Sequence, residues 1–113
     1  MVKRATAARD EDLEQLANLL RLLSDKTRLN ILLMLSGGER NVSNLCDALK
    51  LPQPTVSHHL GLLRMSNVIN GRRDGKQVFY GLDGRVQVDS QSLELKSGAF
   101  SVCITARPGS GAA

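Results

Sequence analysis

The spacing of apolar residues predicts four helices in the first 65 residues. Apolar side chains recur every three or four positions in the segments 10–23, 42–49 and 53–65, which places them on one face of a helix, and the apolar segment 25–36 forms the remaining helix, the second in the chain. Ser24 or Asp25 can cap the second of these helices, and Asn41 can cap the third. The second segment is apolar nearly all round, so we expect it at the centre of the core.

After Asn67 the period of the apolar positions shortens from about four residues to two, which predicts strands. Residues 68–73 and 77–82 are two such segments. Asp74-Gly75 lies between them and predicts a type I′ hairpin turn, which needs positive φ. Apolar residues alternate again from Val86 to Ile104, which predicts three short strands with a second hairpin turn at Ser97-Gly98.

This order of elements predicts the fold class. Two short helices joined by a tight turn, then a hairpin with basic residues at its tip, form a winged helix-turn-helix. The predicted class is therefore mainly α with a β wing (α+β). We expect an N-terminal arm (1–9), a winged helix-turn-helix DNA-binding domain (10–83), a C-terminal β extension (84–106) and a disordered tail (107–113).

Length and composition allow one domain and exclude several classes of protein. The chain has 113 residues, of which 42% are hydrophobic and 3% aromatic, so aliphatic side chains must fill one modest core. The longest apolar run, 31–35, is far shorter than the roughly 20 residues that cross a bilayer. The first ten residues lack the apolar stretch of a secretory signal. We expect a cytoplasmic protein that does not bind a membrane.

The positive charge is concentrated in one segment. The formal net charge is +4, and the excess lies in residues 50–80, which hold five basic residues and one acidic residue. Such a segment favours binding of a polyanion, because each neutralised phosphate releases counterions. The alternative, an ordinary solvated face, stays open on charge alone.

The polar residues of this segment suit DNA rather than catalysis. Small polar groups on the fourth helix can reach base edges, and Arg72, Arg73 and Lys76 near the hairpin tip can meet phosphates or a minor groove. The sequence has no carboxylate pair, nucleophile–base arrangement, metal cluster or phosphate-binding glycine loop. We therefore predict a protein that is not an enzyme and needs no cofactor.

Residues 13–83 resemble the ArsR/SmtB family of bacterial metal- and stress-responsive repressors. The resemblance rests on LSDKTRLNIL (23–32), LPQPTVSHHLGLLR (51–64), Val68 and RRDGKQVFYGL (72–82), and the run QPTVSHHL is its most specific part. The family implies a homodimer on an operator inverted repeat that represses its own gene and neighbouring genes. It also implies that the helix 53–65 enters the major groove.

The resemblance assigns DNA contacts residue by residue. Base or near-base contacts would come from Gln53, Thr55, Ser57 and His58, and backbone contacts from Arg64, Arg72, Arg73 and Lys76. For His59 two alternatives stay open, a DNA contact or an inward hydrogen bond within the motif. The leucine stripe of the first helix is the candidate dimer interface: Leu13, Leu16, Leu20 and Leu23.

The chain departs from the family pattern in several places. Pro52 replaces the usual Ser or Thr cap, and Asn41-Val42-Ser43 replaces the Cys-x-Cys of many metal sensors. The predicted strands stand in place of the usual C-terminal helix, which carries a second metal site in some members. We therefore expect no metal at the known family sites.

The role of the C-terminal strands and the inducing signal are open. The strands extend the wing sheet, pair across the dimer or cover an apolar face, and we favour the role in the dimer. Cys46 and Cys103 are candidate redox residues, although an inert thiol is the simpler interpretation of each. The inducer is a thiol oxidant, a small molecule between the protomers or a partner protein. The alternative function is a protein–protein interaction module that docks through its C-terminal strands.

Overall fold

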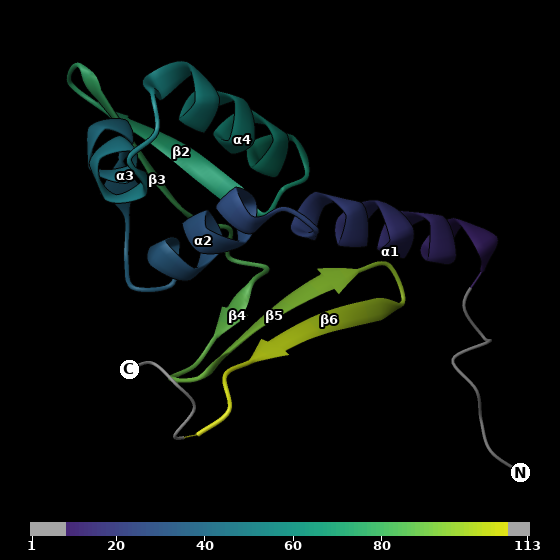
Figure 1. Ribbon diagram of the computed structural model, residues 1–113. Coiled ribbons are helices and arrows are strands. Elements are labelled where there is room, and N and C mark those ends of the chain that lie inside the picture. The colour runs from purple at the N-terminus through teal and green to yellow at the C-terminus, as the bar shows by residue number, and fades with distance from the viewer. Residues whose placement is uncertain (1–8, 109–113) are drawn as a thin grey trace, which may run out of the picture.

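Four helices and two small antiparallel sheets make up the computed structural model, which describes residues 9–108 (Figure 1). The helices are α1 (Asp10–Leu23), α2 (Lys26–Leu35), α3 (Val42–Leu49) and α4 (Gln53–Met65). One sheet has the order β1-β3-β2, with β1 at Arg40–Asn41, β2 at Ile69–Asp74 and β3 at Gln77–Leu82. The other has the order β4-β5-β6, with β4 at Gln87–Val88, β5 at Ser92–Ser97 and β6 at Phe100–Thr105.

The helix starts follow from the capping residues. The Asp25 carboxylate accepts a hydrogen bond from the Arg28 N–H at 2.9 Å, and Asn41 does the same for the Asn44 N–H at 2.8 Å. Asp25 rather than Ser24 therefore caps α2. Helix α4 begins after Pro52 with no side-chain cap, and Pro54 occupies its first turn, where no intrahelical N–H bond is lost.

Both long hairpins turn one residue later than predicted. Asp74 pairs with Gln77 and Ser97 pairs with Phe100, so the loops are 75–76 and 98–99. Within each loop only the glycine has positive φ, +65° at Gly75 and +57° at Gly98. Positive φ at the first loop position alone is the pattern of a type II′ turn, so the predicted type I′ turn at Asp74-Gly75 is wrong.

One hydrophobic core joins the winged helix and the second sheet. Its buried members come from α1, α2, α3, α4, the start of β2 and β5. Leu93 and Leu95 of β5 are buried in this core. Helix α2 is central on one side only, because Leu33 is 56% exposed on the other.

The C-terminal segment forms the separate β4-β5-β6 sheet and does not extend the wing sheet (Figure 1). The tip of its hairpin lies on α1, where the Asp12 carboxylate accepts a hydrogen bond from the Ala99 N–H at 3.2 Å. A Cβ at Gly98 would displace the Asp12 carboxylate, and the positive φ of Gly98 is a conformation that other residues rarely adopt, so glycine suits this contact. The expected strands are confirmed, and they cover an apolar face of the helices. Residues 1–8 of the predicted arm and 109–113 of the predicted tail lie outside the described residues.

Candidate nucleic-acid interface

Helix α4 separates a buried apolar side from an exposed polar side. Val56, Leu60 and Leu63 are almost completely buried and hold the helix on the core. The candidate contact residues Gln53, Ser57, His58 and Arg64 are exposed, and Thr55 is half-buried. The structure therefore presents these polar groups on the part of α4 that residues 9–108 leave free.

The wing, formed by β2, β3 and their loop, places two of its cations in solvent and binds the third internally. Arg73 and Lys76 are exposed, and no hydrogen bond or ion pair joins them to the described part of the chain. Arg72 donates from Nη2 to the Glu39 carboxylate at 2.8 Å and from Nε at 3.3 Å. The hydrogen bond from Arg72 lowers the pKa of Glu39, and the same bond raises the pKa of Arg72. Glu39 was not among the residues singled out from the sequence.

His59 lies on the inner flank of α4, beside α2. Its Nδ1 is 3.2 Å from Nη1 of Arg28, and Arg28 also donates from Nε to the Leu22 carbonyl at 2.7 Å. Since arginine only donates, Nδ1 must accept, and the hydrogen of the neutral ring then sits on Nε2. This contact favours the inward alternative for His59. Sequence reasoning missed Arg28, which connects the end of α1, the start of α2 and α4.

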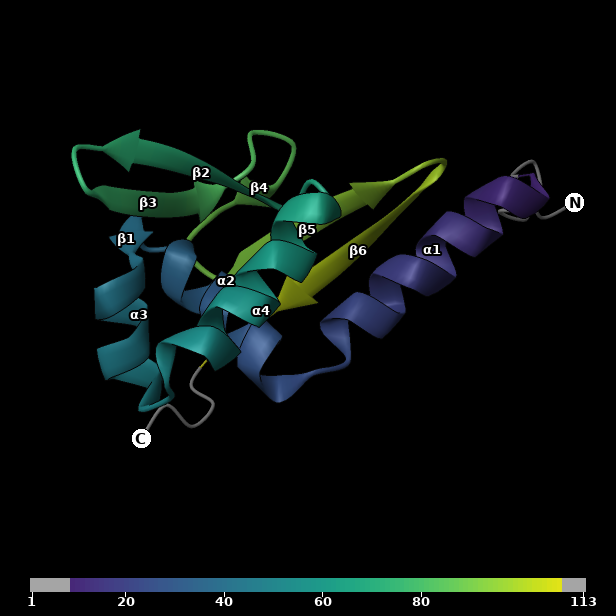
Figure 2. The ribbon, with the colours of Figure 1, turned by 90° about the horizontal axis from the view of Figure 1, so that it is seen from above.

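The short strand β1 connects α3 to the wing (Figure 2). Arg40 and Asn41 pair with Tyr80 and Phe79 of β3, and the Asn41 side chain donates to Gln77 at 2.9 Å. The Asn41 side chain therefore caps α3 and also contacts the wing. A strand of two residues is too short to show an alternating pattern, so no local signal predicts β1.

The leucines of the predicted dimer stripe have different surroundings. Leu13 and Leu20 are 53% and 48% exposed, and Leu16 is half-buried. Leu23 is only 6% exposed and belongs to the core of its own chain. Its side chain is therefore not available to a partner, which differs from the expected interface.

The two cysteines lie apart in the fold. Cys46 on α3 is half-buried and packs against the core. Cys103 on β6 is exposed, with its Sγ 3.4 Å from the Thr105 hydroxyl. Between residues 9 and 108, no three His, Cys, Asp or Glu side chains are grouped closely enough to hold a metal ion. No helix in that range is both long and apolar enough to cross a membrane.

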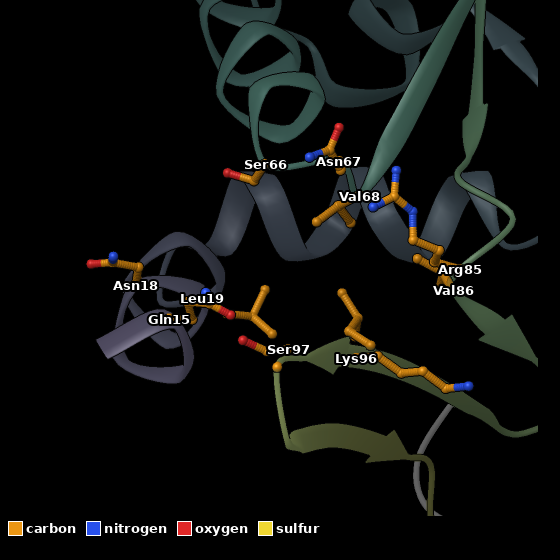
Figure 3. A pocket seen from close by; sticks show the side chains of 12 residues that line it. Gln15, Asn18, Leu19, Ser66, Asn67, Val68, Arg85, Val86, Lys96 and Ser97 are labelled. Atoms are coloured by element: carbon orange, nitrogen blue, oxygen red, sulfur yellow. The ribbon is translucent and has the colours of Figure 1, made fainter. Parts of the chain in front are cut away.

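A pocket of about 390 Å³ lies where the winged helix meets the second sheet (Figure 3). Its lining comes from α1, the α4–β2 turn, the segment before β4, and β5 with its turn: Gln15, Asn18, Leu19, Ser66, Asn67, Val68, Arg85, Val86, Leu95, Lys96, Ser97 and Gly98. None of these is a candidate DNA contact, so the pocket is distinct from the α4 and wing surface.

Comparison with known proteins assigns the family. The profile of the bacterial regulatory protein, arsR family, matches residues 25–70. The transcriptional repressor SdpR of Bacillus subtilis is 34% identical over 73 residues, which cover 65% of this chain and 81% of SdpR. The repressor SmtB of Mycobacterium tuberculosis is 43% identical over 72 residues, which cover 64% of this chain. They cover 53% of SmtB, so the chain spans about half the length of that relative.

Solved structures show the same fold. A homodimeric winged helix-turn-helix DNA-binding domain from Mycobacterium bovis superposes with a TM-score of 0.62 at 30% identity. The superposition covers 68% of this chain and 74% of that domain. With its helix-turn-helix, its wing and these relatives, the chain belongs to the ArsR family of bacterial regulatory proteins.

Proposed function

We propose that the protein is a sequence-specific DNA-binding repressor that acts as a homodimer on an operator inverted repeat and represses its own gene. The observation that carries this proposal is the exposed polar face of α4 beside a wing whose Arg73 and Lys76 are unpaired within the described chain. The excess positive charge of the chain lies in these same two elements, apart from Lys50, which precedes α4. Membership of a family of regulatory proteins, with SdpR and SmtB named as repressors, supports the same function.

In this proposal α4 lies in the major groove. Its N-terminal residues Gln53, Thr55, Ser57 and His58 face base edges, where short polar side chains discriminate between base pairs. Arg64, Arg72, Arg73 and Lys76 bind the phosphate backbone and fix the register of the helix on the duplex. To bind phosphate, Arg72 must either keep its hydrogen bond to Glu39 while it also contacts the phosphate, or break that hydrogen bond.

The homodimer would use the exposed leucines of α1, with Leu13 and Leu20 at its centre. A two-fold dimer presents two α4 helices to half-sites about one helical turn, 34–36 Å, or a small multiple apart. The operator is therefore an inverted repeat. We propose that an effector relieves repression, either as a thiol oxidant, as a small molecule or as a partner protein.

Selection of bound duplexes from a random library tests the proposal. We expect enrichment of one inverted repeat whose half-sites are related by two-fold symmetry. The double variant Ser57→Ala with His58→Ala is the matched control, because it keeps the charge of the wing and truncates only exposed side chains. It should enrich a degenerate sequence. Enrichment of no sequence by the natural protein would contradict the proposal.

A further inference from the structure

We infer that the free edge of β6 pairs with β6 of a second copy, so that the two β4-β5-β6 sheets join into one antiparallel sheet of six strands. The inference rests on the proposed homodimer and names a surface for it beyond the leucines of α1. Five observations carry it: the direction of the edge groups, the lack of protection at that edge, an apolar groove beside it, the symmetry of the strand and its place next to α1.

The hydrogen-bonding groups of alternate β6 residues point away from the sheet. The strand order places β6 at an edge, and its register pairs Phe100, Val102 and Ile104 with Ser97, Leu95 and Leu93. The Ala106 N–H donates to the Gln91 carbonyl at 2.8 Å, which identifies the bonded pairs of the ladder as the even-numbered β6 residues. The backbone N–H and C=O of Ser101, Cys103 and Thr105 therefore point outward.

This edge lacks the protection that edges usually carry. Proteins block unpaired edges with charged side chains, prolines, bulges or very short strands. The edge strand β2 of the wing has Arg72, Arg73 and Asp74, and the edge strand β4 has only two residues. Strand β6 runs for six residues as FSVCIT, with no charge and no proline. An edge of this composition favours pairing with another strand.

A groove with an apolar floor lies at the end of β6, and residues 9–108 leave it open. Its volume is about 260 Å³, and Leu33, Leu93 and Ile104 form its apolar part beside the polar residues of the 89–92 turn. Leu33 is more than half exposed. The inward side chains of β6, Phe100, Val102 and Ile104, are themselves only half-buried. A strand added to the edge would direct its own inward side chains to this same face and cover it.

A second copy is the occupant that the geometry favours. Two identical strands that pair antiparallel are related by a two-fold axis, so the same edge satisfies both copies and the contact closes. Leu13 and Leu20 are the large apolar side chains that α1 exposes, whereas a standard stable interface buries about 800 Å² per partner and involves many more residues. Figure 2 shows β6 running along α1, and the Asp12–Ala99 hydrogen bond joins the two elements. One partner copy can therefore cover both the edge of β6 and the exposed leucines of α1.

Replacement of one outward amide tests the pairing. Ser101→Pro removes an N–H that makes no bond to β5, and the φ of proline fits an edge strand. Ser101→Ala is the matched control, since it removes the hydroxyl and keeps the N–H. In sedimentation velocity over a range of concentrations, Ser101→Ala should dimerise as the natural protein does. Ser101→Pro should raise the dimer dissociation constant by about tenfold or more, because a symmetric interface loses the bond twice.

Amide hydrogen exchange on the natural protein gives a second readout that needs no variant. Pairing predicts that the amides of Ser101 and Cys103 are protected at dimer concentrations and exchange freely on dilution to the monomer. Free exchange of both amides in the dimer would overturn the inference, as would undiminished dimerisation of a folded Ser101→Pro. A titration of the protein against the DNA upstream of its own gene does not depend on this edge. Specific DNA binding with an unpaired β6 would therefore refute the edge pairing and leave the proposed repressor intact.

Discussion

Arg72 in the wing donates two hydrogen bonds to Glu39, at 2.8 and 3.3 Å between nitrogen and carboxylate oxygen. Its guanidinium carbon also lies 5.1 Å from the ring centre of Phe79. One of the cations assigned to phosphate is thus held by an internal carboxylate before any DNA arrives. Glu39 directly precedes β1 and so lies next to the wing in space, although it is 33 positions from Arg72 in the sequence.

Glu39→Gln should therefore increase DNA affinity. The change removes a negative charge near the proposed phosphate contacts, so Arg72 can neutralise its phosphate in full without sharing its charge with Glu39. The slope of log K against log salt should become steeper by up to about one, the value for one full phosphate contact. Anisotropy titrations at several salt concentrations measure this slope, with Glu14→Gln on α1 as the charge-matched control. An unchanged affinity and an unchanged slope in Glu39→Gln would contradict the competition between Glu39 and phosphate for Arg72.

Truncation of the exposed α4 side chains should reduce specificity. Ser57→Ala or His58→Ala should cost about 1–3 kcal/mol on the operator and much less on unrelated duplexes, if each reads a base edge. Competition titrations with operators altered at one base pair at a time locate the base that each residue reads. Equal losses on operator and unrelated DNA would assign these residues to the backbone instead.

Arg73→Gln should lower DNA affinity without changing sequence specificity. Arg73 is exposed in the wing and has no polar partner in the described part of the chain, so its charge is available to a phosphate. Its loss should weaken binding to all sequences alike and lower the salt slope by about one. The same titrations measure both effects, and a sequence-selective loss would contradict the phosphate role.

His59→Ala should lower the stability of the fold. The change leaves Nη1 of the half-buried Arg28 without its partner across α2 and α4, at an expected cost of about 1–3 kcal/mol in the free energy of unfolding. Urea denaturation measures the loss, and His59→Gln, which restores an acceptor, should recover part of it. A variant of full stability that binds DNA weakly would instead support the DNA-contact alternative for His59.

Asp83 gives the fold a defined acid sensitivity. This buried carboxylate accepts hydrogen bonds from the Arg85 backbone N–H at 2.9 Å and from Arg85 Nε at 3.1 Å. The backbone bond is the main reason why the pKa of Asp83 lies below its ordinary value. A carboxylate with a lowered pKa in the folded state stabilises the fold above its unfolded pKa of about 3.9 and loses this contribution as the pH falls through the folded value.

The stability difference between the natural protein and Asp83→Asn should therefore be constant from about pH 5 to 8 and shrink below about pH 4. Urea midpoints measured across this range check the window. A difference that changes near neutral pH would assign the effect to another group.

Local signals in the sequence predict the helices, the caps of α2 and α3 and every strand except β1, because apolar period and cap chemistry act within a few residues. The sequence predicts both turns one residue too early, because a glycine indicates that a turn is present but does not indicate which position of the loop the glycine occupies. Leu23 lies on the same stripe as Leu20, yet only the docking of α1 on the core decides that it is buried. The contacts Arg28–His59 and Glu39–Arg72 join residues 31 and 33 positions apart, so no local pattern contains them.

The central claim, a specific repressor, is tested most directly by a fluorescence-anisotropy titration of the protein against the DNA upstream of its own gene. A scrambled duplex of the same composition is titrated alongside, at two salt concentrations. We predict tight binding to the upstream DNA with a clear margin over the scramble at both concentrations. Equal and strongly salt-dependent binding to both duplexes, or binding to neither, would contradict the claim.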